Sequence, residues 1–76
     1  MKYIIADEKK AQAAGFSPSL HVTVKGRMVL NGREVAQSQS LTGTLTERVR
    51  SIGGTLYDSA ADTKTALNEI NKPLNQ

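Results

Sequence analysis

His21 is the only histidine of the chain and therefore the first candidate for acid–base or nucleophilic chemistry. Such chemistry needs a nucleophile within hydrogen-bond reach of the imidazole ring and a further group that holds the ring in place. Thr23 follows two residues later, but no carboxylate lies near His21 in the sequence. We therefore expect His21 to be a solvated side chain on a strand, and we predict that the protein is not an enzyme.

Two other patterns that can carry chemistry have simpler structural interpretations. Asp7 and Glu8 are adjacent carboxylates, which can bind a hard cation but normally cap a helix when they stand at its start. Gly53 and Gly54 are not followed by a helix that opens with Lys-Ser or Lys-Thr, so they indicate neither a phosphate-binding loop nor a dinucleotide site. The chain has no cysteine, which excludes disulfides and thiolate metal sites. We expect no metal and no cofactor.

Basic residues gather in the middle of the chain. The formal net charge is +3, and segment 16–57 carries the positive excess. Because Lys and Arg displace counterions from nucleic acid, four side chains of this segment are candidates for phosphate contacts: Lys25, Arg27, Arg48 and Arg50. The period of a strand predicts Lys25 and Arg27 on one face, about 7 Å apart. A solvated sheet face, partly neutralised by Glu34 on the neighbouring strand, explains the same spacing without a ligand.

Aromatic side chains that stack on nucleic-acid bases are scarce. Tyr3, Phe16 and Tyr57 are the only ones, and none falls in the hairpin predicted around the basic residues. A sheet that binds single-stranded bases through a row of aromatic rings is therefore not indicated. If the basic segment binds nucleic acid, we expect contacts to phosphates rather than to base edges.

The elements that must position these residues begin with a short apolar strand over residues 2–6, which has the composition of a central strand. Asp7 is predicted to cap a helix through residue 14, and Gly15 supplies its left-handed stop. Alternating apolar side chains over residues 20–30 predict a half-buried strand.

Asn31 and Gly32 are the preferred pair for a two-residue type I′ turn. They predict a hairpin in which residues 33–37 return antiparallel, with Met28 opposite Val35. An alternative interpretation breaks the strand at residues 25–27, with Gly26 in a turn or a bulge, and makes a three-stranded meander.

The second half of the chain opens with a small, polar loop near residues 37–43. Thr44 and Glu47 have the spacing of a capping box and predict a helix that ends before Gly53. A brief strand is expected over residues 55–57. Asp58 or Ser59 then caps a final helix, whose inward positions and end are marked by Thr63, Leu67, Ile70, Lys72, Pro73 and Leu74.

These elements read βαββαβ plus a C-terminal helix in one small α+β domain over residues 1–76, and this order favours the ferredoxin-like split βαβ fold. One feature disagrees with that topology, because the polar segment 33–37 would form a central strand. The alternative is a three-stranded β-meander with two or three packed helices.

Size and composition guide the functional expectation. The chain has 76 residues with 21 bulky apolar side chains, and a core of this size supplies roughly 3–5 kcal/mol of net stability. We therefore expect a small non-enzymatic protein–protein interaction or assembly module that self-associates or binds a protein partner. The alternative is a small basic nucleic-acid-binding accessory or regulatory protein. The short apolar start is neither a signal sequence nor a membrane span, so we expect a cytoplasmic protein without a membrane partner.

Overall fold

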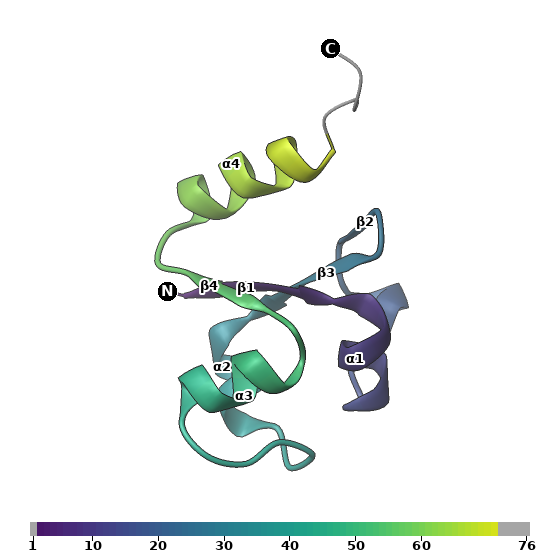
Figure 1. Cartoon of the computed structure of the whole chain (residues 1–76), viewed down its shortest axis with the longest axis vertical. Coiled ribbons are helices and arrows are strands. Elements are labelled where there is room, and N and C mark those ends of the chain that lie inside the picture. Colours follow the sequence, from purple (N-terminus) through teal and green to yellow (C-terminus); the bar gives the residue numbers. More distant parts are fainter. Residues whose placement is uncertain (1, 72–76) are drawn as a thin grey trace.

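A computed structural model describes residues 2–71, in which helices cover both faces of one small sheet (Figure 1). The elements in chain order are β1 (Tyr3–Asp7), α1 (Glu8–Ala13), the 3-10 helix η1 (Pro18–Leu20), β2 (Thr23–Val24), β3 (Arg27–Asn31), α2 (Gly32–Gln37), α3 (Leu45–Ser51), β4 (Thr55–Tyr57) and α4 (Ala60–Ile70). The predicted α+β class is confirmed.

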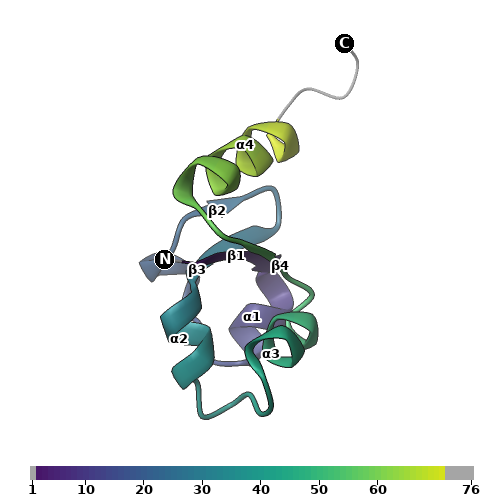
Figure 2. The ribbon, with the colours of Figure 1, turned by 90° about the vertical axis from the view of Figure 1, so that its left-hand side faces the viewer.

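The four strands form an antiparallel sheet in the order β2-β3-β1-β4. Strand β1 is central, as its apolar composition predicts, and Ile4 lies opposite Leu30 on β3 and Leu56 on β4. Helices α1, α2 and α3 lie on one side of the sheet and α4 lies on the other (Figures 1 and 2). Because side chains alternate between the faces of a strand, β1 has apolar residues to bury on both sides.

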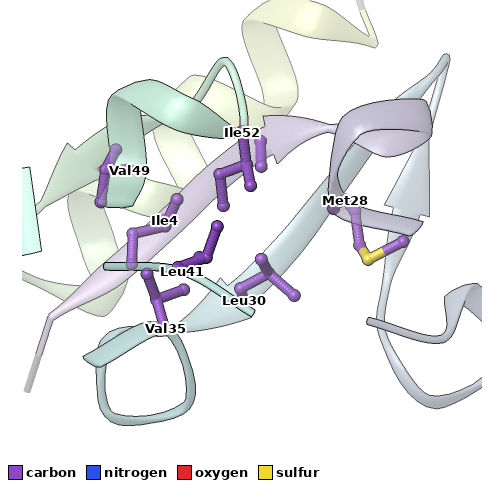
Figure 3. Packing of buried hydrophobic residues seen from close by; sticks show 9 residues of the cluster. Ile4, Met28, Leu30, Val35, Leu41, Val49 and Ile52 are labelled. Carbon is purple, nitrogen blue, oxygen red and sulfur yellow. The ribbon is translucent and has the colours of Figure 1, made fainter. Parts of the chain in front are cut away.

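The main core lies between the sheet and the first three helices (Figure 3). Ile4 and Leu30 from the sheet, Val35 from α2 and Val49 from α3 are all buried there. Leu41, from the loop between α2 and α3, joins the same cluster. This packing explains why the loop near residues 37–43, although polar, contains one leucine: Leu41 anchors it to the core.

The opposite face of the sheet, which we call the outer face, is turned towards α4. Ile5 is buried on this face, and Thr63 on α4 is buried as well. Helix α4 begins as predicted at Ser59, whose hydroxyl accepts a hydrogen bond of 3.1 Å from the Asp62 amide. Of the positions predicted to mark the end of this helix, Lys72, Pro73 and Leu74 lie outside the described residues.

Other predicted helix boundaries are confirmed by their hydrogen bonds. The Asp7 carboxylate accepts a hydrogen bond of 3.0 Å from the Lys10 amide and so caps α1. Thr44 and Glu47 form the predicted capping box of α3. The brief strand at residues 55–57 is β4, which pairs with β1.

The hairpin predicted at Asn31-Gly32 is wrong. Asn31 has an extended backbone (φ −84°, ψ 137°) and caps α2, with Glu34 completing a capping box. The same residues therefore start a helix, which carries Val35 into the core instead of placing it opposite Met28. Gly32 is needed for close backbone approach, because a Cβ atom there would stand 3.0 Å from the Lys2 carbonyl oxygen.

The turn lies instead at the break that the alternative interpretation placed near Gly26. Lys25 (φ 48°) and Gly26 (φ 79°) both have the positive φ that a type I′ turn requires. They join β2 to β3, with Val24 opposite Arg27. Lys25 and Arg27 therefore do not share one strand face. The three-stranded meander is also wrong. The segment expected to form its third strand, residues 33–37, belongs to α2, and the sheet has four strands.

The ferredoxin-like topology stays a prediction. The observed elements contain the predicted succession of strands and helices. However, the second and third strands along the chain are Thr23–Val24 and Arg27–Asn31, and α2 is an additional helix. The disagreement over a polar central strand disappears, because residues 33–37 are not in the sheet.

Candidate functional site

The four predicted phosphate-contacting residues do not form one patch. Lys25 is exposed in the turn between β2 and β3, and Arg27 is exposed at the start of β3. Arg48 and Arg50 both belong to the last turn of α3, but their environments differ: Arg48 is half-buried and Arg50 is exposed.

Arg48 uses its guanidinium group to hold backbone carbonyls. Its Nε donates a hydrogen bond of 2.9 Å to the Gly43 carbonyl, and its Nη1 donates to the carbonyls of Val35 (3.1 Å) and Ser38 (2.7 Å). The last carbonyls of a helix have no partner within the helix, and Arg48 supplies one at the end of α2. The side chain thus ties α2 to the start of α3, a role that no feature of the sequence pattern indicates.

Arg27 and Arg50 each line a surface hollow that includes Gly53, in the turn between α3 and β4. A hollow of about 320 Å³ is lined by Arg50 and Gly53, and a second of about 240 Å³ is lined by Arg27 and Gly53. Lys10 from α1 lies over the same turn: its Nζ would be 3.7 Å from a Cβ atom built on Gly53. We call this cluster of Lys10, Arg27 and Arg50 around Gly53 the Gly53 corner.

Among residues 2–71, the cations of the Gly53 corner outnumber the carboxylates beside it. Within residues 2–71, the one ion pair between side chains joins His21 and Glu34, so no carboxylate oxygen is within 4.0 Å of these three cations. Asp7 brings one negative charge to the corner: its Cβ would be 3.3 Å from a Cβ atom on Gly53, it lies opposite Arg27 in the sheet, and its carboxylate accepts a hydrogen bond from the Lys10 amide. Sequence reasoning missed Lys10, because α1 contributes to the corner only through tertiary packing.

His21 is held by two oxygen acceptors. Its Nδ1 lies 2.8 Å from the Ser17 carbonyl oxygen, and its Nε2 lies 3.1 and 3.2 Å from the two carboxylate oxygens of Glu34. Only the doubly protonated ring donates to both partners. Burial of the ring lowers the pKa of His21, but the bond to Ser17 and the bond and charge of Glu34 outweigh it, so the pKa is raised.

The expectation of a solvated histidine on a strand is therefore wrong. His21 follows η1, only 11% of its side chain is exposed, and the Phe16 ring meets it edge-on at 6.2 Å between centroids. The carboxylate that it needs is Glu34, which the predicted hairpin placed beside the basic residues instead. Through its bonds to Ser17 and Glu34, His21 links η1 to α2.

Apolar side chains are exposed beside the edge of the sheet that β2 forms. Leu20 is 79% exposed and Val22 is 60% exposed. The Val22 carbonyl accepts a hydrogen bond of 2.8 Å from the Val29 amide, which continues the ladder between β2 and β3 by one residue. We call Leu20, Val22 and strand β2 the β2 edge.

Residues 2–71 hold no group of three or more His, Asp or Glu side chains that could bind a metal ion together. None of the helices in this range has the length and apolar composition needed to cross a bilayer.

The fold and these surfaces define a small α+β protein with a four-stranded antiparallel sheet. Comparison of the chain with protein-family models, curated proteins and solved structures found no match.

Proposed function

We propose that this protein is a small, non-enzymatic interaction module that self-associates or binds a protein partner through the β2 edge. The observation that carries the proposal is the exposure of Leu20 (79%) and Val22 (60%), which both lie just before β2 in the chain. Large apolar side chains that gather on one surface are typical of interaction sites.

The backbone of β2 supports the same proposal. Among residues 2–71, strand β2 has a neighbour only on the β3 side, so its other side can accept a strand from another chain. Helix α4 packs on β1 and β4, at the other end of the sheet from β2. Nearer the β2 edge, the side chains of Val24 and Val29 are only half-buried. An apolar strand that pairs with β2 would cover Val22 and extend the sheet.

The test is the mass of the protein in solution as a function of concentration. Light scattering after size-exclusion chromatography is expected to show a dimer or larger species that dissociates on dilution. The double variant Leu20→Ser, Val22→Thr should be monomeric, whereas Ala36→Ser, at an exposed position of α2, should associate normally. A wild-type monomer up to high micromolar concentration would exclude self-association, and unchanged association in the double variant would exclude the β2 edge.

The second candidate function is binding of nucleic acid, and the Gly53 corner favours it. Lys10, Arg27 and Arg50 carry positive charge to one place without ion pairs among residues 2–71. About two to three phosphate contacts predict a slope of roughly −2 to −3 for log affinity against log salt on duplex DNA. No binding at low salt to single- or double-stranded DNA or RNA would remove this candidate. Under either function we expect the protein to work in the cytoplasm.

A further inference from the structure

We propose that the smaller hollow at the Gly53 corner binds the phosphate group of a small phosphate ester. This pocket of about 240 Å³ lies between the outer face of the sheet and the end of α4. Its lining consists of Ile5, Arg27, Gly53, Thr55, Tyr57 and Ile70. No carboxylate belongs to this lining, so the pocket is suited to an anion.

Three side chains of the lining are free to donate hydrogen bonds to such a ligand. Within residues 2–71, no hydrogen bond engages the guanidinium of Arg27 or the hydroxyls of Thr55 and Tyr57. An arginine provides several N–H donors in a planar fork that matches two phosphate oxygens, and each hydroxyl adds one donor. Thr55 and Tyr57 are two residues apart on β4, so the strand period places them on the same face as the pocket.

Lys10 and Arg50 lie near Gly53, which lines the pocket, and add positive charge on that side. Gly53 has φ +64°, and a side chain there would stand 3.4 Å from Cδ and 3.7 Å from Nζ of Lys10. Arg50 lines the neighbouring hollow on the same glycine. Asp7 balances only one of these three positive charges, and a bound phosphate would offset the remaining positive charge.

The size of the pocket restricts the ligand. Pockets for drug-sized molecules are roughly 300–1,000 Å³, so about 240 Å³ suits a phosphate group with a short organic remainder rather than a dinucleotide. Ile5 and Ile70 provide an apolar floor and wall for that remainder. We therefore favour a phosphate ester of a few carbon atoms.

This site is separate from the β2 edge, so it can exist whether or not the protein associates through that edge. It shares its cations with the nucleic-acid candidate, and the probes must therefore distinguish a small ester from a polyanion. The experiment is a titration of the ¹⁵N-labelled full chain, followed by amide NMR shifts, at constant ionic strength. The probes are glycerol 3-phosphate, inorganic phosphate, glycerol and a single-stranded oligonucleotide.

Glycerol 3-phosphate is expected to shift the amides of Gly53, Gly54 and Thr55 in a saturable manner, more strongly than inorganic phosphate does, whereas glycerol shifts none of them. Arg27→Gln should weaken the affinity about tenfold, since it removes a charged donor. Arg33→Gln, which removes the same charge from an exposed position on α2, should leave it unchanged.

Three results would overturn the proposal. The first is the absence of saturable shifts with either phosphate probe, and the second is an equal loss of affinity in the Arg27 and Arg33 variants. The third is binding of the oligonucleotide at the corner without binding of the ester, which would assign these cations to nucleic acid. The dispersion of the amide spectrum of each variant reports whether it is folded.

Discussion

His21 and Glu34 are thirteen positions apart in the chain, yet the Nε2 atom of His21 lies 3.1 Å from one Glu34 carboxylate oxygen and 3.2 Å from the other. Glu34 also accepts a hydrogen bond from the Asn31 amide as part of the capping box of α2. One carboxylate thus stabilises the start of α2 and attaches η1 to it. The Nδ1 side of the ring completes this link by bonding to the Ser17 carbonyl.

The first prediction is that this link makes stability depend on pH. The folded-state pKa of His21 is raised above its ordinary value of 6.5. Protonated His21 therefore stabilises the folded state fully below about pH 6.5, and this contribution is lost as the pH rises through the folded-state pKa. Urea unfolding from pH 5.5 to 9 should show that the stability difference between wild type and His21→Gln shrinks as the pH rises.

Glu34→Gln serves as the partner variant, because an amide oxygen still accepts the Asn31 hydrogen bond but carries no charge. It should shift the pKa of His21, followed by NMR, back towards the ordinary value. A difference between wild type and His21→Gln that is constant or grows with pH would contradict the assigned protonation state.

The second prediction concerns Arg48. Arg48→Met keeps much of the apolar stem but removes the donors to the carbonyls of Val35, Ser38 and Gly43. We expect a loss of about 1–3 kcal/mol in the free energy of unfolding, because part-buried carbonyls lose a charged donor and the Val35 carbonyl keeps only its bond of 3.3 Å from the Ser38 amide. Arg50→Met is the matched control on the same helix and should change stability by less than about 0.5 kcal/mol. Equal effects of the two substitutions would show that the Arg48 hydrogen bonds do not stabilise the fold.

The third prediction distinguishes the capped helix from a hairpin turn at Asn31. Asn31→Ala removes the capping side chain of α2 and should cost about 1 kcal/mol in unfolding free energy, whereas Asn31→Ser should retain most of it. Gly32→Ala should destabilise as well, because its Cβ atom would stand 3.0 Å from the Lys2 carbonyl oxygen. Chemical denaturation measures the free energy of unfolding of all three variants. A Gly32→Ala protein as stable as wild type would contradict the close approach of α2 to Lys2, just before β1.

The fourth prediction concerns the turn between β2 and β3. Lys25 is the one residue other than glycine with positive φ within residues 2–71. Asn adopts this backbone conformation with less strain than Lys, so Lys25→Asn should raise the free energy of unfolding by roughly 0.4–1 kcal/mol. Gly26→Ala should lower it, because φ is +79° although the space around a Cβ atom is open. Thermal unfolding tests whether Lys25→Asn is more stable, and Gly26→Ala less stable, than wild type. A destabilised Lys25→Asn together with a stabilised Gly26→Ala would place the turn elsewhere.

Sequence alone determined the elements whose signals are local. The caps at Asp7, Thr44 and Ser59 are hydrogen bonds to amides three residues further along, so the residues that form them are readable as short motifs. Strands β1 and β4 follow equally from short apolar runs between turn residues.

Tertiary packing decided between local motifs that fit two structures. Asn31-Gly32 satisfies the preference of a hairpin turn, and Asn31 with Glu34 satisfies the preference of a helix cap. The helix is formed because it buries Val35 against the core and brings Gly32 onto the Lys2 carbonyl. Neither contact is visible in the sequence, since both join the first strand to a segment about thirty residues later.

The same reason applies to the functional surfaces. Lys10, Arg27 and Arg50 gather near Gly53 because α1 and β3 begin there and α3 ends there. His21 contacts Glu34 because residues 33–37 form a helix. Charge type and number are properties of the sequence. Which charges become neighbours depends on how buried apolar side chains pack the elements together, and no periodicity within a single element records that arrangement.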